Sequence, residues 1–161
     1  MTYQKALNPS ISVVVPVKNE VTTISPLIDE ICEALGTIET YEIVYIDDGS
    51  TDTTFTELKH KKLHCKQLSV YRHDKSYGQS AAICTGVINA KGPVIITLDG
   101  DGQNDPADIP NLLSKFRSSK IQKNFMVVGW RTARKDTLLK RITSKVANAI
   151  RKNFLGDDTP D

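Results

Sequence analysis

Residues 94–103 read VIITLDGDGQ, and this stretch decides the fold class that we expect for the chain. Its first five residues, Val94–Leu98, are apolar or β-branched, which is typical of a strand covered on both faces of a parallel sheet. Acidic residues and glycines follow directly. Open α/β sheets bind their ligands at this carboxyl end of the strands. The stretch therefore predicts a buried parallel strand with a ligand site at its end.

Four other short runs have the same apolar, β-branched character, and helical patterns separate them. These runs are Ser12–Val15, Glu42–Ile46, Leu68–Tyr71 and Phe125–Val128. The alternation of strand and helix predicts an α/β fold with an open, mostly parallel sheet. Its crossovers are expected to be right-handed, and its helices to cover both faces of the sheet.

Capping patterns predict where the helices begin. Ser25 and Pro26 look like an N-cap and first-turn pair, and the apolar stripe that follows stops at Gly36. Ser76 and Gln79 have the spacing of a capping box. The helices are expected at residues 26–35, 77–90, 105–116 and 136–153.

The size and composition of the chain predict one soluble domain. Its 161 residues carry a formal net charge of +2 and are enough to bury a core without disulfides or metals. No apolar run reaches membrane-spanning length, and the N-terminus lacks the pattern of a signal peptide. Three cysteines without CxxC spacing fit the reducing cytosol, so we expect a cytoplasmic protein.

The segment DGDGQ at residues 99–103 is a candidate metal site. In extended backbone the side chains alternate, so Asp99, Asp101 and Gln103 can project to one side. Their hard oxygen atoms suit Mg²⁺ or Mn²⁺, which would keep open positions for phosphate oxygens. Gly100 leaves room for a ligand to approach the backbone. The alternative interpretation is a solvated acidic turn.

Acidic residues also follow the first two expected strands, in VVPVKNE (14–20) and IDDGSTD (46–52). Because neighbouring parallel strands end at one edge of the sheet, these groups should converge there. Carboxylates at such an edge can accept from a nucleobase N–H or a ribose hydroxyl. The adjacent pair Asp47 and Asp48 favours such a role, whereas Asp52 can equally be a turn or N-cap residue.

The sequence contains no Walker motif GxxxxGK[ST] and no GxGxxG. Binding of a phosphate would therefore depend on a metal ion rather than on a glycine-rich loop. This absence argues against kinases, GTPases and nicotinamide enzymes, and it favours a metal-bridged nucleoside diphosphate.

Five segments in order resemble the signatures of family 2 glycosyltransferases with the GT-A fold. They are VVVPVKNE (13–20), VYIDDGSTD (44–52), KSYGQSAAICTG (75–86), ITLDGDGQNDPADIP (96–110) and VVGWRTARKD (127–136). The basic segment at residues 129–152 is similar to the dolichol-phosphate mannose synthase branch and its bacterial polyprenyl-phosphate relatives. The resemblance implies a catalytic domain at residues 11–161, which we expect to be incomplete at its C-terminus, after a flexible N-terminus at residues 1–10.

The resemblance implies roles for individual residues. Asp99 and Asp101 would be catalytic and, with Gln103, would bind the metal, and Arg131 would also be catalytic. Residues implied for the acceptor phosphate are Arg131, Arg134, Arg141 and Ser144. Residues implied for the nucleotide sugar are Pro16, Val17, Glu20, Asp47, Asp48, Lys75, Gly78 and Gly100.

Residues 115–152 hold twelve lysines and arginines and one acidic residue, Asp136, whereas the rest of the chain is acidic. A cationic surface of this kind could bind a lipid phosphate or an anionic membrane. Nucleic acid is the weaker alternative, because only 6% of the residues are aromatic and Trp130 alone lies beside the arginines and lysines of residues 131–145, where it could stack on bases. A solvated helix face remains a further interpretation.

The resulting functional hypothesis is inverting transfer of a sugar from a UDP- or GDP-linked donor to a polyprenyl phosphate, at the cytoplasmic face of the membrane. Mg²⁺ or Mn²⁺ would serve as cofactor, and a homo-oligomer is possible. One alternative is a family 2 enzyme that transfers to a sugar hydroxyl. Another is a fragment that binds nucleotide sugars without turnover, because the family's catalytic domain usually continues beyond the final DDTPD.

Overall fold

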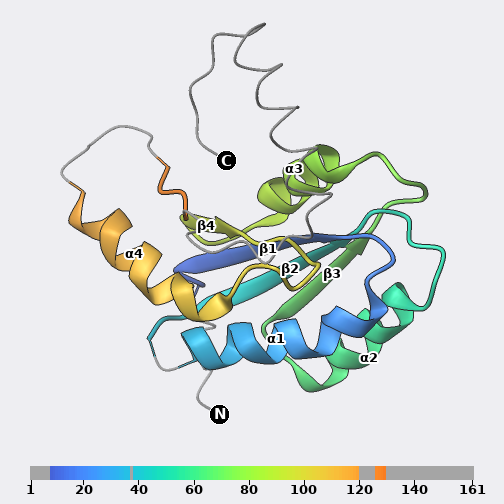
Figure 1. Ribbon diagram of the computed structural model, residues 1–161, viewed down its shortest axis with the longest axis horizontal. Coiled ribbons are helices and arrows are strands. Elements are labelled where there is room, and N and C mark those ends of the chain that lie inside the picture. The colour runs from blue at the N-terminus through green and yellow to red at the C-terminus, as the bar shows by residue number, and fades with distance from the viewer. Residues whose placement is uncertain (1–7, 37, 120–125, 130–161) are drawn as a thin grey trace, which may run out of the picture. The chain divides into compact units, whose positions relative to one another are not determined.

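The computed structural model describes residues 8–36, 38–119 and 126–129, in which strands and helices alternate (Figure 1). The strands are β1 (Ile11–Val17), β2 (Tyr41–Asp47), β3 (Leu68–Arg72) and β4 (Val94–Thr97). The helices are α1 (Val21–Leu35), α2 (Thr54–His64), α3 (Gln79–Asn89), the short 3₁₀ helix η1 (Pro106–Asp108) and α4 (Ile109–Ser118).

The four described strands form one sheet in the order β3-β2-β1-β4. All neighbouring strands in it are parallel, and β1 pairs with both β2 and β4, so that Val13 lies opposite Ile43 and Ile96. All seven residues of β1 are buried, as expected for a central strand covered on both faces. The predicted α/β fold with an open parallel sheet is confirmed. The expectation that the strand at residues 94–98 is buried on both faces is wrong, because β4 lies at an edge of the described sheet and its Ile95 is 40% exposed.

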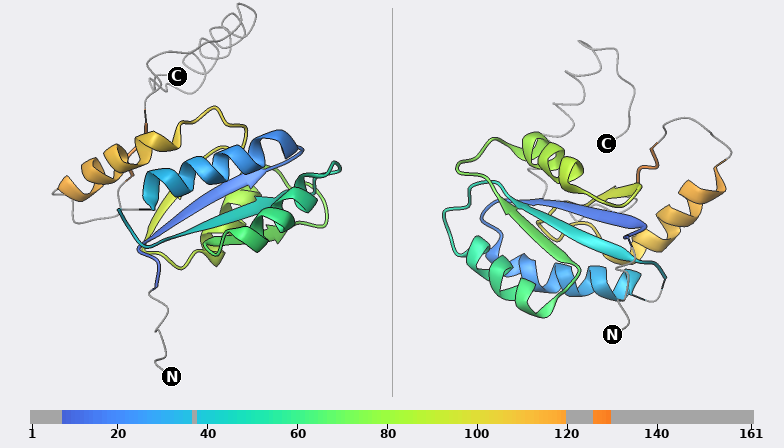
Figure 2. Two further views of the ribbon diagram at one scale, coloured as in Figure 1. Left: turned by 90° about the horizontal axis from the view of Figure 1, so that it is seen from below. Right: turned by 180° about the vertical axis from the view of Figure 1, so that it is seen from behind.

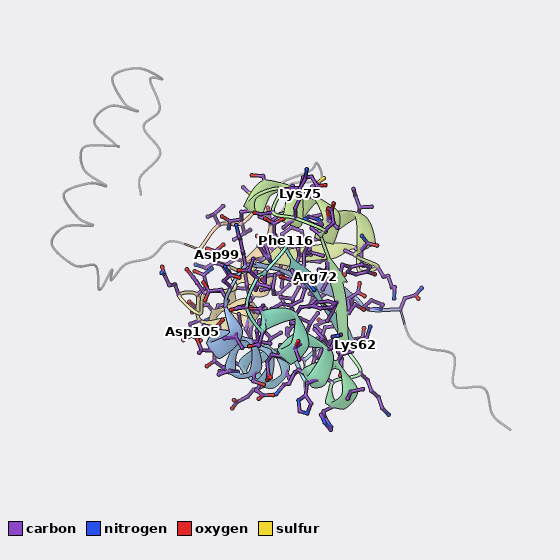
Figure 3. All side chains as sticks on the ribbon, turned by 90° about the vertical axis from the view of Figure 1, so that its right-hand side faces the viewer. Lys62, Arg72, Lys75, Asp99, Asp105 and Phe116 are labelled. Atoms are coloured by element: carbon purple, nitrogen blue, oxygen red, sulfur yellow. The ribbon has the colours of Figure 1, made fainter. Side chains whose placement is uncertain are left out.

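Helices cover both faces of the sheet, but unequally (Figures 1 and 2). On one face α1, α2 and α4 contribute to a large core, whose largest members include Tyr45, Ile28 and Leu58. On the other face α3 packs over a much smaller core, which consists of Val14, Val44, Ile46 and Ala82. Of α2 only Thr54 and Leu58 are buried, and basic side chains such as Lys62 point outward (Figure 3).

Helix α3 lies very close to the sheet because it carries a glycine where it crosses β1. A Cβ atom at Gly86 would lie 2.3 Å from Cγ1 of Val14 and 3.4 Å from Cγ1 of Ile46. Only a residue without a side chain permits this approach. The close packing holds the N-terminal end of α3 beside the carboxyl ends of β1 and β2.

Helix α1 begins at Val21, so the predicted start at Ser25 and Pro26 is wrong. The chain turns earlier, where the Thr23 N–H donates to the carbonyl of Glu20 at 3.1 Å. The Ser25 hydroxyl donates to Glu57 of α2 at 3.0 Å instead of capping a helix.

The predicted capping box at Ser76 and Gln79 does not form. Helix α3 begins at Gln79, and its N-cap is Gly78, which has a φ of 93°. The Ser76 hydroxyl donates to Asp48, and the Gln79 amide donates to Asp99. Both polar side chains are therefore engaged with carboxylates that follow other strands.

The helix predicted after Asp105 is confirmed, as η1 followed by α4, with the Asp105 carboxylate accepting from the Ala107 N–H. The predicted fifth strand is wrong for Met126–Val128, because no strand of the described sheet pairs with these residues. Phe125, residues 1–7 and the helix expected at 136–153 lie outside the described residues. At the N-terminal end of β1, the Ser10 backbone N–H donates to the Thr40 carbonyl at 2.8 Å.

Candidate active site

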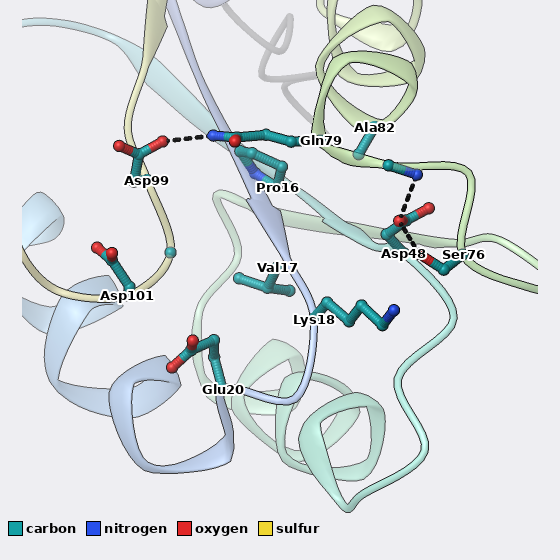
Figure 4. A pocket seen from close by; sticks show the side chains of 12 residues that line it. Pro16, Val17, Lys18, Glu20, Asp48, Ser76, Gln79, Ala82, Asp99 and Asp101 are labelled. Carbon is teal, nitrogen blue, oxygen red and sulfur yellow. Dashed lines mark hydrogen bonds between the residues drawn. The ribbon is translucent and has the colours of Figure 1, made fainter. Parts of the chain in front are cut away.

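A cavity of about 480 Å³ lies where the loops after β1, β2 and β4 meet the start of α3 (Figure 4). Acidic, basic and small side chains surround it. The lining residues are Pro16, Val17, Lys18, Glu20, Asp48, Ser76, Gly78, Gln79, Ala82, Asp99, Gly100 and Asp101. This is the carboxyl edge of the sheet, where the sequence predicted a ligand site.

Asp48 is the most heavily hydrogen-bonded acid of the cavity. Its Oδ1 accepts from His73 Nδ1 at 2.7 Å and from the Tyr77 N–H at 2.8 Å, and its Oδ2 accepts from the Ser76 hydroxyl and the Gly78 N–H. Burial by itself would raise the pKa of Asp48, but these four donors outweigh it and lower the pKa well below its usual range. Asp48 is therefore ionised at neutral pH and fixes the start of α3.

His73 orients Asp48 from outside the cavity, a role that no sequence motif indicates. An ionised carboxylate only accepts hydrogen bonds, so Nδ1 of His73 carries the proton. Its other ring nitrogen, Nε2, lies 2.9 Å from the Thr85 hydroxyl of α3. The imidazole thus connects the end of β3 with both β2 and α3, a contact that only the folded arrangement reveals.

The loop after β1 presents Lys18 and Glu20 to the cavity. Between them Asn19 adopts a left-handed conformation with a φ of 57°, which asparagine tolerates better than most residues. The Asn19 N–H donates to the Ser50 hydroxyl, and the Glu20 N–H donates to the Thr54 hydroxyl, both at 2.9 Å. The β2–α2 segment therefore holds this loop from behind.

Asp47 lies beneath the turn after β2 and does not line the cavity. Its Oδ1 accepts from the Ser50 N–H at 3.0 Å. Its Oδ2 lies 3.1 Å from Nε of Arg72, as an ion pair without the alignment of a hydrogen bond. Arg72 also donates to the Ser50 carbonyl. These contacts make Asp47 part of the support for the turn.

Asp99 and Asp101 approach the cavity on the loop that follows β4. Between them, Gly100 lies against β1: a Cβ there would be 2.1 Å from Cγ1 of Val17 and 2.8 Å from the Pro16 carbonyl oxygen. The Thr23 hydroxyl donates to the Gly100 carbonyl at 2.7 Å. Close backbone packing therefore fixes both carboxylates at the edge of the sheet.

The donor set suits a hard divalent cation such as Mg²⁺ or Mn²⁺. Asp99 and Asp101 supply two carboxylates to one cavity, and oxygen ligands are those that such ions prefer. Within the described residues, no three His, Cys, Asp or Glu side chains are grouped to hold a metal. Two protein carboxylates would leave coordination positions for other oxygen ligands, such as diphosphate oxygens and water.

Most of the predicted donor-site residues come together, and a few do not. Lys75 does not line the cavity, and its ammonium group lies over the Tyr77 ring. Gln103 does not line it either, and its N–H donates to Asp101. Predicted residues that line the cavity are Pro16, Val17, Glu20, Asp48, Gly78, Asp99, Gly100 and Asp101. Lining residues without a predicted site role are Lys18, Ser76, Gln79 and Ala82.

The residues implied for the acceptor phosphate, Arg131, Arg134, Arg141 and Ser144, lie outside the described residues. In the part of the chain that the structure describes, no helix is long and apolar enough to cross a membrane.

Among curated proteins, the chain is similar to two bacterial enzymes with polyprenyl-phosphate names. It is 37% identical to the dodecaprenyl-phosphate galacturonate synthase of Rhizobium johnstonii over 143 residues, which cover 87% of this chain and 41% of that protein. It is 38% identical to the undecaprenyl-phosphate 4-deoxy-4-formamido-L-arabinose transferase of Salmonella paratyphi B over 153 residues. These residues cover 91% of this chain and 44% of that protein. The chain thus spans less than half the length of these relatives.

Solved structures show the same fold. The mannosyltransferase of Pyrobaculum calidifontis, solved with GDP-mannose and Mn²⁺, matches 71% of this chain and 34% of that one, with a TM-score of 0.61 and 23% identity. The glucosyl-3-phosphoglycerate synthase of Mycobacterium tuberculosis was solved with UDP. The match covers 70% of this chain and 41% of that one, with a TM-score of 0.57 and 24% identity. The GT-A fold is confirmed.

The family itself is established by the sequence. The model of the family described as glycosyl transferase family 2 matches residues 12–161, nearly the whole chain. This match includes the strand ends and loops that surround the cavity, from Pro16 to Asp101. The chain therefore belongs to glycosyl transferase family 2.

Proposed function

We propose that this chain is the donor-binding part of an inverting, metal-dependent glycosyltransferase that moves a sugar from a nucleoside diphosphate to a polyprenyl phosphate. One observation carries the proposal: four carboxylates, Glu20, Asp48, Asp99 and Asp101, lie around a single cavity at the carboxyl edge of a parallel sheet. The two polyprenyl-phosphate relatives support the acceptor class.

The lining residues have two separate tasks in this proposal. Asp48 and Glu20 face the nucleoside, with Pro16 and Val17 as the apolar wall beside it. Asp99 and Asp101 would hold a divalent cation and, through it, the diphosphate. A cation held there would neutralise the charge that builds on the leaving nucleoside diphosphate. Gln103, on the same loop, is a further candidate ligand from the sequence.

A phosphate acceptor explains why a dedicated general base is not required. A phosphate monoester has its second pKa near ~6, so at neutral pH its attacking oxygen is already largely ionised. Transfer to a sugar hydroxyl would instead need a carboxylate to take the proton. Arg131, Arg141 and Ser144 are our candidates for holding the acceptor phosphate, with Arg134 as a weaker one.

The donor half of the proposal can be tested by calorimetry with UDP and with GDP, each in Mn²⁺ and in EDTA. We expect one of the two nucleotides to bind much more tightly with Mn²⁺, and Asp101→Asn to abolish that gain because it removes an anionic ligand. Asp108→Asn is the matched control, since Asp108 is exposed and does not line the cavity. Equal affinity in Mn²⁺ and EDTA would contradict the metal site.

An assay of sugar transfer distinguishes the proposed enzyme from a transferase that uses sugar hydroxyls and from a protein that only binds nucleotide sugars. A form extended to the length of the relatives should transfer sugar to polyprenyl phosphate and not to free sugar hydroxyls. Transfer to a sugar hydroxyl would instead favour the family 2 enzymes that use such hydroxyls as acceptors. Nucleotide-sugar binding without any transfer would favour a binding protein.

A further inference from the structure

Gln79 makes a contact that directly links α3 to the proposed metal site. It is the first residue of α3, and its Nε2 donates to Oδ1 of Asp99 at 2.7 Å. The two residues lie 20 positions apart in the sequence and come from different walls of the same cavity (Figure 4). The amide therefore joins the loop after β4 to the start of the helix.

The start of α3 is well fixed, so Gln79 can serve as a reference point. The N–H groups of Tyr77 and Gly78 and the Ser76 hydroxyl all bind Asp48, each at 2.8 Å. Further along the helix, Gly86 lies against β1 and β2. The backbone of residue 79 is thereby held on both sides, and its side chain is long enough to reach across to Asp99.

A glutamine is chemically suited to orient a carboxylate that binds a cation. Its amide donates a hydrogen bond but carries no charge, so Asp99 keeps its full negative charge. A lysine or arginine in this place would form an ion pair and compete with the metal. With Oδ1 engaged by the amide, the other carboxylate oxygen, Oδ2, is left to face a cation.

We propose that Gln79 is a positioning residue for Asp99, which fixes the orientation of this carboxylate for the divalent cation. The inference rests on the proposed function, since it presupposes a metal at Asp99 and Asp101. Hydrogen-bond partners of metal ligands are commonly worth about 10- to 100-fold in metal affinity. Through Gln79, the position of the start of α3 thereby affects the affinity of the site for the cation.

The quantity to measure is the metal-dependent gain, defined as the Kd of the nucleoside diphosphate in EDTA divided by its Kd in Mn²⁺. Calorimetry with the better of UDP and GDP gives both values. Gln79→Met keeps the length of the side chain and removes the donor. We expect it to lower the gain by about 10- to 100-fold while the Kd in EDTA stays unchanged. Ser80→Ala, at an exposed neighbour outside the cavity, should match the wild type.

A double-mutant cycle shows whether Gln79 acts through Asp99. In the Asp99→Asn background, Gln79→Met should have no further effect on the gain, because the carboxylate that it orients is no longer there. Additive losses would mean that Gln79 acts on the cation or nucleotide directly, and would overturn the positioning role. An unchanged gain in the single variant would also overturn it.

Two further outcomes keep this inference separate from the proposed function. A wild-type protein with no metal-dependent gain would overturn the metal site itself, and the role of Gln79 with it. A variant that loses nucleotide affinity equally in Mn²⁺ and EDTA would make Gln79 a nucleotide contact or a structural residue. Thermal unfolding in EDTA verifies that Gln79→Met remains folded.

Discussion

The side-chain oxygen of Asn19 accepts the backbone N–H of Thr51 at 2.8 Å, which ties the loop after β1 to the loop after β2. The Asn19 backbone meanwhile has a φ of 57°, in the left-handed region. One residue thus supplies both an unusual backbone conformation and the bond between two loops of the cavity. The two contributions can be separated by substitution.

We expect Asn19→Ala to lower the free energy of unfolding by about 2 kcal/mol, because it loses the acceptor and places an ordinary side chain at positive φ. Asn19→Gly removes only the acceptor and should lose less. Asn19→Asp keeps an acceptor oxygen and should remain near the wild type. Urea unfolding at neutral pH measures all three, and equal losses for Gly and Ala would show that the backbone conformation is unimportant.

Asp48 should make the protein sensitive to acid. Its pKa in the folded state is lowered, whereas that of an unfolded Asp is near ~3.9. The stabilisation is therefore fully present above pH ~4 and is lost as the pH falls below it toward the folded-state pKa. Asp48→Asn should be less stable at pH 7 and show a weaker loss of stability below pH ~4. Urea unfolding across pH 3–7 tests this, and parallel curves for the two proteins would contradict it.

Tyr45 should be replaceable by phenylalanine without loss. Its hydroxyl is buried and has no hydrogen-bond partner among the described residues. Removing an unsatisfied buried hydroxyl should leave the free energy of unfolding unchanged or raise it by about 1–2 kcal/mol. Tyr41→Phe is the control, because the Tyr41 hydroxyl interacts with Cys32 and its removal should bring no gain. Destabilisation by Tyr45→Phe would reveal a partner for this hydroxyl.

The basic segment at residues 115–152 should bind anionic membranes. Each basic group near such a surface contributes about 1 kcal/mol, and salt screens the attraction. Sedimentation with phosphatidylserine vesicles should show binding at low ionic strength that fades at high ionic strength. Lys140→Glu with Lys145→Glu should weaken it, whereas Lys59→Glu with Lys62→Glu on α2 should not. Salt-independent binding to neutral vesicles would indicate an apolar contact instead.

Arg131 and Arg141 should serve the acceptor rather than the donor. In the proposed site, a metal at Asp99 and Asp101 would meet the charge of the donor, whereas an acceptor phosphate needs cations of its own. In a form with the full length of the relatives, Arg131→Lys and Arg141→Lys should raise the KM for polyprenyl phosphate, because lysine keeps the charge but loses the planar fork. Nucleotide affinity should stay near normal. Loss of nucleotide affinity with an unchanged acceptor KM would reverse the assignment.

Patterns local to one segment predicted the described strands well. The continuous apolar runs of β1 to β4 and the acids that follow β2 and β4 are visible without any tertiary information. For the same reason, most of the cavity's acidic lining could be named from strand ends. The choice between Asp47 and Asp48 could not, because only the folded turn shows that Asp47 is turned toward Arg72 and Ser50.

The predicted helix starts were wrong where side chains distant in the sequence bind the residues of a local capping motif. Ser76 and Gln79 have the spacing of a capping box, but two carboxylates from other loops bind them more favourably than the helix end does. Ser25 is likewise engaged by Glu57 of α2. His73 carries no motif at all, and its importance arises solely from the meeting of β2, β3 and α3. Such contacts follow from the fold and cannot be derived from spacing.

The unequal covering of the sheet has a mechanical consequence. The large core fixes α1, α2 and α4, whereas α3 packs on three buried side chains of the sheet, Val14, Val44 and Ile46, and its start contacts both Asp48 and Asp99. The surroundings of both carboxylates therefore depend on the position of this one helix, whereas the main core does not. Asp48 and Asp99 thus share one helix as support, so a substitution that displaces the start of α3 would disturb both ends of the cavity without deforming the sheet.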